Sequence, residues 1–303
     1  MSIRLPFGLK DNKLLSVQEV ASGLACGCYC PGCGQPLVAR KGKQKLHHFA
    51  HYQEAACEHG LESILHWKAK DFFSKSTFLV LPACYLRNWG APIFPAQRLA
   101  YSTAKIEYHL NPIKPDILLY AGQKPKLLVE IAVSHPADSE KIKQIRRLGI
   151  PALEIDVAHL LPDMQTRDFP EMALRDSLLK DTTHKKWLYH PAREKLEGWL
   201  RQQAQAKPVK HIQLKNNHIH SVSPCPANKR MWKNAWQTPS SYAFVLQDCL
   251  HCPFCSEIQY EQEWRGGRLI PTLPKTVLCW AERWGEVREQ WRGLTQLDHP
   301  IFP

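Results

Sequence analysis

Residues 114–135, KPDILLYAGQKPKLLVEIAVSH, contain two mostly apolar runs on either side of a polar GQK segment. Because side chains alternate between the two faces of a strand, the aliphatic face of this stretch is expected to pack against a core. That face carries Ile117, Leu119, Val129, Ile131 and Val133. The pattern predicts a β-hairpin whose turn lies at residues 122–124, GQK.

Helical spacing of apolar residues precedes and follows this hairpin. It covers residues 61–73, LESILHWKAKDFF, and 137–149, ADSEKIKQIRRLG, where Gly149 is a helix stop. Residues 151–160, PALEIDVAHL, then predict a buried strand. Strand, helix and strand in succession predict a parallel crossover, which is right-handed in nearly all sheets. We therefore expect an α/β core in the order helix, strands, helix, strand, with a mixed sheet.

Four domains are expected along the chain. The runs TFLVLPACYL (77–86) and AKIEYHL (104–110) resemble strands, and residues 171–206 have an amphipathic helical pattern. Aromatic-rich strands surround the cysteines of the last third. The predicted domains are an N-terminal zinc-binding element at 1–60, the core at 61–160, a helical connector at 161–207 and a zinc-ribbon-like domain at 208–303.

The charge of the chain favours a polyanionic partner. Among 303 residues, 40 Lys and Arg stand against 28 Asp and Glu, a formal net charge of +12. On charge alone, an excess of this size fits either a nucleic-acid-binding protein or a merely basic soluble protein, and DNA is the expected partner. The chain has no apolar run of membrane-spanning length and no visible secretory signal, so a cytoplasmic location is expected.

Eleven cysteines fall into two clusters that leave the centre of the chain empty. In the first cluster, a Cys-x2-Cys knuckle is followed by a predicted hairpin, PLVARKGKQKLHHFAH, and by a further cysteine. Zinc prefers four Cys or His ligands, and a hairpin this small needs a metal ion for stability. The predicted zinc ligands are Cys30, Cys33, His51 and Cys57, with His48 as the alternative to His51. Cys26 and Cys28 exceed the four ligands that zinc needs.

The second cluster predicts a zinc ribbon in the last third of the chain. It contains SPCP at residues 223–226 and DCLHCPFC at residues 248–255. The predicted ligands are Cys225, Cys249, Cys252 and Cys255, with His251 as a spare. The Cys-x2-Cys-x2-Cys spacing also allows an iron–sulfur cluster, which is the less favoured alternative.

Two carboxylates share the polar face of the central hairpin. With the turn at residues 122–124, Asp116 lies directly opposite Glu130, where cross-strand Cβ atoms are about 5 Å apart. Adjacent carboxylates repel unless a cation lies between them, and oxygen ligands suit Mg²⁺ or Mn²⁺. On the preceding helix, Glu62, His66 and Lys70 recur every four residues and form one polar stripe. Such a stripe fits either a solvated helix face or the wall of an active site.

The stretch from Cys30 to about Val157 resembles the competence protein CoiA-like family. The resemblance is carried by Cys57 and by CPGCGQPLVARKG, HHFAH, ESILHWKAK, KPDILL, VEIAVSH and EKIKQIRRLGIPALEID. It implies a PD-(D/E)xK-type, restriction-endonuclease-like core preceded by a small zinc-binding element that contains HFAH. It also implies that Glu62, Asp116 and Glu130 bind the catalytic metal ions. The C-terminal cysteine cluster lies outside the resemblance.

Ala132 departs from the superfamily pattern, which often has lysine two residues after the second carboxylate. A lysine on a neighbouring helix can reach the same point, so Lys141 is the first candidate and Lys70 the second. His66 and His135 are candidates for acting on the attacking water.

The expected function is a metal-dependent DNA nuclease, acting in DNA uptake, recombination or defence. The alternative is an inactive nuclease fold with two zinc elements that binds nucleic acid. A third possibility is a scaffold whose ribbon binds protein, marked by an exposed apolar patch in place of a basic one.

Overall fold

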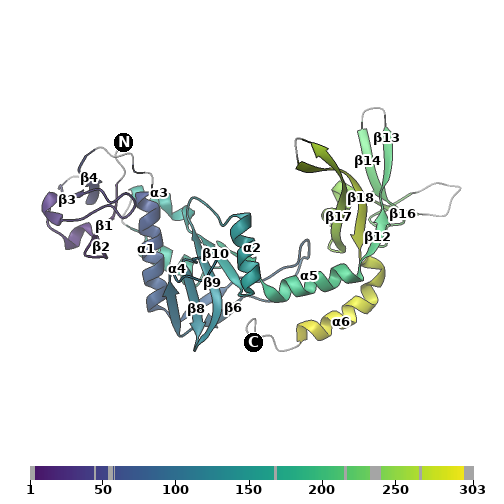
Figure 1. Ribbon diagram of the computed structural model, residues 1–303, viewed down its shortest axis with the longest axis horizontal. Helices are drawn as coiled ribbons and strands as arrows, with labels where there is room; N and C mark the ends of the chain where they lie inside the picture. Colours follow the sequence, from purple (N-terminus) through teal and green to yellow (C-terminus); the bar gives the residue numbers. More distant parts are fainter. Residues whose placement is uncertain are drawn as a thin grey trace. The chain divides into compact units, whose positions relative to one another are not determined.

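The computed structural model describes residues 4–43, 46–53, 57, 59–166, 169–214, 217–232, 240–265 and 268–296. The chain divides into two compact units (Figure 1). The core unit comprises Met1–Ala83 and Ala96–His190, and the C-terminal unit comprises Cys84–Pro95 and Pro191–Pro303. This division is coarser than the four domains predicted above. Within the described residues, no helix is both long and apolar enough to cross a membrane.

The core unit begins with two hairpins. One is formed by β1 (Phe7–Lys10) and β2 (Lys13–Ser16), and the other by β3 (Leu37–Arg40) and β4 (His48–His51). The second hairpin is the one predicted from the sequence. Leu5 and Phe49, both fully buried, join the N-terminal segment to β4 through reciprocal backbone hydrogen bonds.

A mixed five-stranded sheet forms the centre of the core unit, in the order β11-β10-β9-β8-β7. The strands are β7 (Thr103–Ile106), β8 (Ile117–Ala121), β9 (Lys124–Ala132), β10 (Ala152–Asp156) and β11 (Lys185–Tyr189). β9 and β10 are parallel, as the predicted crossover requires, and the other pairs are antiparallel. A separate antiparallel pair is formed by β5 (Phe78–Leu81) and β6 (Gln97–Ala100). The predicted mixed α/β architecture is therefore confirmed.

The register of the central hairpin agrees with the prediction, although its turn is tighter. Ile117 pairs with Val129 and Leu118 with Leu128, so continuing the ladder by one residue places Asp116 across from Glu130. The turn contains only residues 122 and 123, because residue 124 already pairs with residue 121. Between Tyr120 and Leu119 an irregularity shifts the pairing by one residue. From Leu119 towards Asp116 the strand pairing is therefore the predicted one.

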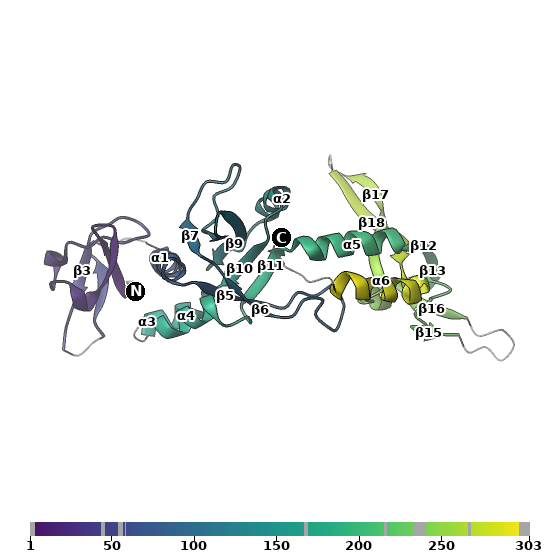
Figure 2. The same ribbon diagram turned by 90° about the horizontal axis from the view of Figure 1, so that it is seen from below.

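Helices flank the sheet on opposite sides: α1 (Gly60–Lys75) on one and α2 (Ser139–Leu148) on the other (Figures 1 and 2). The Asp138 side chain caps α2 by accepting from the Lys141 backbone N–H, and Gly149 ends it in a left-handed conformation. Ile145 is the buried residue of α2 and packs in one cluster with Leu118 and Leu128.

The predicted helical connector is only partly helical. It contains α3 (Leu161–Thr166) and α4 (Glu171–Leu179), but then β11, which the sequence analysis did not predict. β11 pairs with β10, and Leu188 on β11 packs in the same cluster as Ile145. Its sequence KKWLY is too short and too charged for a two-residue period to be distinct.

The longer segment of the C-terminal unit begins with α5 (Pro191–Gln203) and contains two antiparallel sheets. One sheet is β12 (Gln205–Pro208), β18 (Arg268–Cys279) and β17 (Cys255–Arg265); the other is β13 (Lys210–Leu214), β14 (Asn217–Val222), β16 (Ser241–Phe244) and β15 (Arg230–Met231). β16 and β17 confirm the aromatic-rich strands predicted there. The fully buried Trp280 contacts the rings of Trp89 and Phe254, and α6 (Trp284–Gln296) follows.

Because β11 completes the core, we predict that Leu188→Ala lowers the free energy of unfolding of the core unit by about 2–5 kcal/mol, as expected for a truncated core leucine. Met172→Ala, on the exposed surface of α4, is the control and should change this free energy by less than about 0.5 kcal/mol. Denaturant titration of the full chain measures both values. Equal effects of the two substitutions would show that β11 is not part of the core.

Candidate functional site

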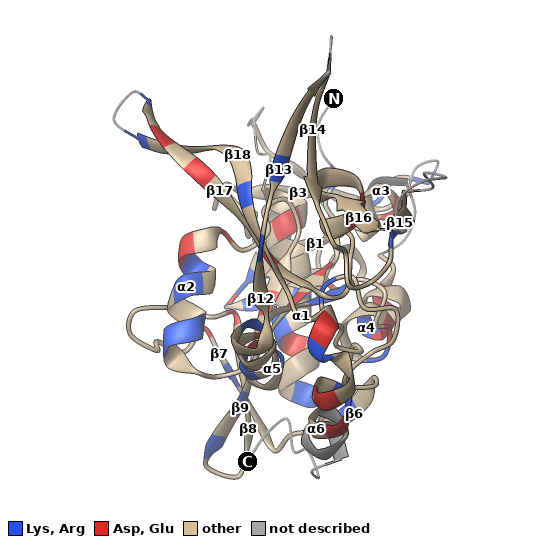
Figure 3. Ribbon diagram, turned by 90° about the vertical axis from the view of Figure 1, so that its right-hand side faces the viewer, with Lys and Arg blue, Asp and Glu red and all other residues tan. Residues whose placement is uncertain are grey.

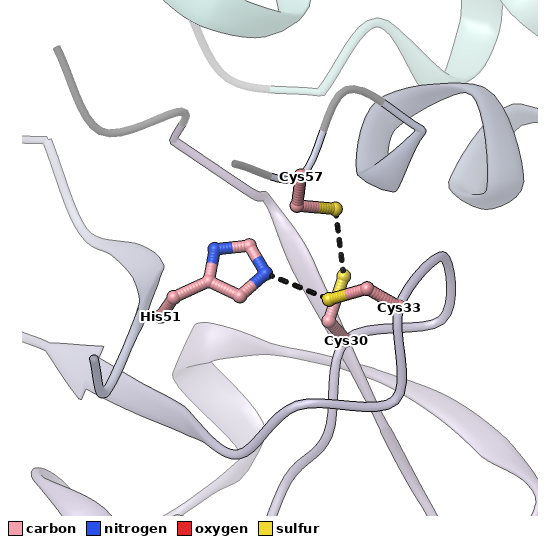
Figure 4. A group of neighbouring side chains, drawn as sticks. All are labelled: Cys30, Cys33, His51 and Cys57. Atoms are coloured by element: carbon pink, nitrogen blue, oxygen red, sulfur yellow. Dashed lines mark hydrogen bonds between the residues drawn. The ribbon is translucent and has the colours of Figure 1, made fainter. Parts of the chain in front are cut away.

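Four possible zinc ligands lie together near the start of α1 (Figure 4). Cys30 and Cys33 precede β3, His51 ends β4, and Cys57 lies shortly before α1. Their ligand atoms are all within 4.8 Å of one another. In the part of the chain that the structure describes, no other group of three or more His, Cys, Asp or Glu meets this limit. These are the four ligands predicted from the sequence, and they could hold a zinc ion.

The spacing of the ligand atoms fits tetrahedral coordination. The Sγ atoms of Cys30 and Cys57 are 3.7 Å apart, and Cys33 Sγ lies 3.3 Å from His51 Nε2. Zn–S bonds of about 2.3 Å place two sulfur ligands roughly 3.8 Å apart in a regular tetrahedron. The two contacts therefore have the length of tetrahedron edges.

The backbone around the knuckle favours thiolates. Burial raises the pKa of Cys30 to about 12, and the backbone N–H groups of Cys33 and Gly32 oppose that rise. Burial also acts to raise the pKa of Cys33, but the Gln35 N–H and the neighbouring thiols outweigh it and leave the pKa below its ordinary value. The ligand group lies close to the first residue of α1, Gly60. A Cβ atom added to this glycine would lie 3.4 Å from Cys30 Sγ.

The remaining N-terminal candidates lie outside this ligand group. His48 is three residues from His51 on β4, so the two side chains point to opposite faces. The His48 Nδ1 donates to a backbone carbonyl instead, at 2.8 Å. The thiols of Cys26 and Cys28 are buried and also donate to backbone carbonyls.

The predicted C-terminal ligands share one region but are less closely grouped. Cys225, Cys249 and Cys255 belong to one hydrophobic cluster, and Cys252 is buried nearby in the same turn. Their sulfur atoms do not form a described group within the 4.8 Å limit. The second zinc site and the alternative iron–sulfur cluster therefore remain predictions. His251, the spare ligand, is exposed.

Three acidic side chains form a row across the central strands. The strand register places Asp116 across from Glu130, and Glu130 is in turn the parallel-ladder partner of Glu154 on β10. Glu154 is paired with Lys186 on β11, whose amine lies 2.6 Å from its carboxylate. Lys186 therefore neutralises Glu154 within the sheet, whereas the lysines near Asp116 and Glu130 come from α1 and α2.

Glu130 is a buried carboxylate in contact with a lysine from the other side of the crossover. Its side chain is 6% exposed, and the Lys141 amine donates to Oε2 at 2.7 Å. Oε1 is buried with no hydrogen-bond partner in the described part of the chain. Burial raises the pKa of Glu130 to about 7, Lys141 opposes this rise, and the nearby charge of Asp116 adds to it.

Asp116 receives its contacts from β9 and α1. One oxygen accepts the Ile131 backbone N–H at 2.9 Å, while the other lies 3.7 Å from His66 Nδ1 and 3.9 Å from the Lys70 amine. Burial lowers the pKa of His66, although Asp116 favours its protonated form. The two candidate lysines therefore lie at different carboxylates, Lys141 at Glu130 and Lys70 at Asp116.

Glu62 lies on the same side of α1 as His66. Burial acts to raise its pKa, but a hydrogen bond from Ser134 and the rings of His59 and His66 hold the pKa below its ordinary value. The structure thus gathers the predicted polar stripe, the hairpin acids and Lys141 into one region of the core unit. The oxygens of Glu62, Asp116 and Glu130 do not meet the 4.8 Å limit, so a catalytic metal site there remains a prediction.

Sequence reasoning missed two acids of this region. Glu107 accepts from Lys70 and Lys114, both at 2.5 Å, and these bonds lower its pKa to about 2. Glu154 accepts the Ala137 backbone N–H just before α2. Glu154 could have been predicted from the parallel crossover, because the pairing of β9 with β10 places Glu154 beside Glu130. Glu107 lies in a loop and gave no comparable signal.

Comparison with known proteins supports the N-terminal assignment. Residues 16–60 match the family model for the N-terminal domain of competence protein CoiA, a range that contains all four residues of the zinc ligand group. This match agrees with the predicted resemblance to the CoiA-like family in the N-terminal part of the chain. No curated protein and no solved structure matches the chain.

Because Cys33 completes the ligand group, we predict that Cys33→Ser removes one zinc ion per chain and destabilises the N-terminal hairpins. Cys26→Ser is the matched control, since that thiol lies outside the ligand group and donates to the Leu37 carbonyl, a bond that a hydroxyl can replace. Elemental analysis of the purified variants gives the zinc content. Full zinc content in Cys33→Ser would rule out this ligand group.

Glu130 predicts a pH dependence of stability. Its pKa is about 7 in the folded protein against an ordinary 4.5, so the unfolded chain loses this proton first. Stability is then lost as pH rises between these two values, and the loss persists at higher pH. Glu130→Gln should raise the free energy of unfolding by on the order of 1–3 kcal/mol at pH 8, with little effect near pH 4.

The control for this experiment is Glu140→Gln, an exposed position on α2. Denaturant titrations at the two pH values compare both variants with the wild type. A Glu130→Gln effect that is larger at acidic pH would contradict the assigned pKa.

Proposed function

We propose that this chain, which carries a CoiA-type N-terminal domain, is a metal-dependent DNA nuclease with a competence-related role. The observation that carries the proposal is the contact between Lys141 and Glu130. A PD-(D/E)xK site needs an amine beside its second carboxylate, and Ala132 cannot supply one. The Lys141 amine, 2.7 Å from Glu130 Oε2, provides it from α2.

The carboxylates fit a hard divalent cation such as Mg²⁺ or Mn²⁺. Glu130 Oε1 is a buried acceptor without a partner among the described residues, and its neighbour across the strands is Asp116. Oxygen ligands of this kind suit these ions, and Glu62 is the third candidate ligand. When bound, such an ion stabilises negative charge on a phosphate and favours ionisation of water.

The side chains of the site have separate roles in this proposal. Lys141 lies where it can offset charge developing on the phosphate and orient the attacking water. His66 lies beside Asp116, and burial lowers its pKa, which favours the neutral form that can accept a proton from that water. Lys70 is held by Glu107 as well as by Asp116, which leaves it less available for substrate.

The proposed substrate is DNA because of the charge of the chain and of α2. The net charge is +12, and α2, which supplies Lys141, also carries the exposed basic residues Lys143, Arg146 and Arg147. Figure 3 shows basic segments along α2. Such residues can contact phosphates on either side of the reacting one. Zinc at the cysteine clusters is assigned a structural role in this proposal.

The cleavage and binding experiment below also tests two alternatives to a nuclease. In the first, the Lys141–Glu130 pair only neutralises a buried charge, and the fold binds nucleic acid without cutting it. The second is a protein-binding scaffold, which the exposed apolar surface of the β17–β18 hairpin favours. That surface includes Trp264 and its ladder partner Leu269, with side chains 71% and 50% exposed.

We predict that Asp116→Ala and Glu130→Ala abolish DNA cleavage with Mg²⁺ or Mn²⁺ but preserve DNA binding. Lys141→Ala should lower the cleavage rate roughly 10²-fold or more, the scale of losing one transition-state donor. Lys70→Ala should cost much less. Lys75→Ala, an exposed lysine at the end of α1 whose amine pairs with Asp71, is the control and should cut normally.

Cleavage is measured on single- and double-stranded DNA, with EDTA as the metal-free control, and binding is measured in parallel at several salt concentrations. Normal cutting by Lys141→Ala would refute the relocated lysine. A wild type that binds DNA in a salt-dependent manner but never cuts it would favour the binding protein, and absence of binding would favour the scaffold.

A further inference from the structure

Five of the six cysteines of the C-terminal unit lie in one cluster, one more than a zinc site needs. We propose that this unit binds one zinc ion through Cys225, Cys252, Cys255 and Cys279, with Cys279 taking the place that sequence spacing assigns to Cys249. This inference concerns a structural metal site and does not depend on nuclease activity.

Strand register brings Cys279 to the knuckle. Cys279 is the last residue of β18 and the ladder partner of Cys255, the first residue of β17. The ladder is irregular just after this pair, between Cys255 and Glu257, but opposed residues in an antiparallel pair have Cβ atoms on the order of 5 Å apart. Cys279 is therefore adjacent to the C-terminal Cys-x2-Cys knuckle, formed by Cys252 and Cys255, although it is distant from that knuckle in sequence.

The C-terminal knuckle has the same backbone arrangement as the N-terminal one. The N–H groups of Phe254 and Cys255 face the sulfur of Cys252, as those of Gly32 and Cys33 face the sulfur of Cys30. Backbone N–H groups aimed at sulfur stabilise a thiolate, the form that binds metal. The shared arrangement assigns Cys252 the role that Cys30 has in the first ligand group.

The same comparison favours Cys279 over Cys249 as a zinc ligand. The backbone two residues further along acts to lower the pKa of Cys255, from Glu257, and the pKa of Cys279, from Ala281. The Cys255 thiol also donates to the Glu257 carbonyl, at 3.7 Å. Gln35 does the same for Cys33 in the N-terminal group. The strongest influences on Cys249 are burial and the other four cysteines, with no backbone N–H among them.

Cys225 begins a second turn of related sequence, Cys-Pro-Ala-Asn, beside Cys-Pro-Phe-Cys at residues 252–255. The Asn228 N–H donates to the Cys225 carbonyl, just as the Cys255 N–H donates to the Cys252 carbonyl. Asn228, at φ 48°, occupies the position of the second cysteine. This turn therefore supplies one ligand, and the fourth must come from outside both turns, where Cys279 lies.

Burial and charge around the cluster fit a bound cation. Cys225 and Cys252 are 6% and 5% exposed, and several thiolates so buried would repel one another without a metal ion. Positive charges act on three of the thiols: Lys229 on Cys252, Arg87 on Cys255, and Lys207 on Cys279. The sulfur atoms are spaced more widely than the N-terminal set, so coordination requires them to move inward.

The experiment compares three single variants of the full chain, Cys279→Ser, Cys249→Ser and Cys84→Ser. Cys84 is a buried thiol of the same unit that lies outside the five-cysteine cluster, and it serves as the matched control. Elemental analysis should give two zinc ions per chain for the wild type, Cys249→Ser and Cys84→Ser, and one for Cys279→Ser.

Cobalt substitution provides a second measurement if Cys279→Ser does not fold. Histidine can replace a cysteine ligand, so Cys279→His should keep two metal ions per chain while its cobalt absorption shifts from the wild-type spectrum. Loss of a metal ion from Cys249→Ser, or a Cys279→His spectrum identical to the wild type, would overturn the assignment. A wild type with one zinc ion, or with iron in the second site, would overturn the zinc site itself.

Discussion

Pairing of β9 with its two neighbours determines where the charged side chains of the core unit lie. Because side chains alternate, a shift of one residue would turn Glu130 into the opposite face and separate it from Asp116 and Glu154. The register is stabilised by aliphatic burial on both faces, including Leu128 and Val129, which are fully buried. Hydrophobic packing thus holds three like charges in a row that electrostatic repulsion alone would disperse.

Lysines from other elements reduce the electrostatic repulsion among the three carboxylates of this row. Lys186 neutralises Glu154 within the sheet, Lys141 approaches Glu130 from α2, and Lys70 approaches Asp116 from α1. Glu130 still has a raised pKa, because one lysine only partly offsets its burial. The region is therefore left short of positive charge at the place where a divalent cation is proposed to bind.

Much of this arrangement follows from local sequence patterns. Alternation along residues 114–135 predicted the hairpin register, and the Cys-x2-Cys knuckle with its later His and Cys predicted the N-terminal ligand group. What the sequence did not reveal depends on contacts between distant segments. β11 is recognisable only by its pairing with β10, and Cys279 comes close to Cys255 only because a long hairpin returns the chain.

Moving the lysine from strand to helix changes what holds the site together. Two residues on one strand keep their spacing through the covalent backbone, whereas Lys141 and Glu130 stay together only while α2 remains docked. That docking rests on Ile145, the buried residue of the helix, and on the Glu154 hydrogen bond to the segment before it. The separation between amine and carboxylate is thus a tertiary property, sensitive to any ligand that loosens or tightens the helix against the sheet.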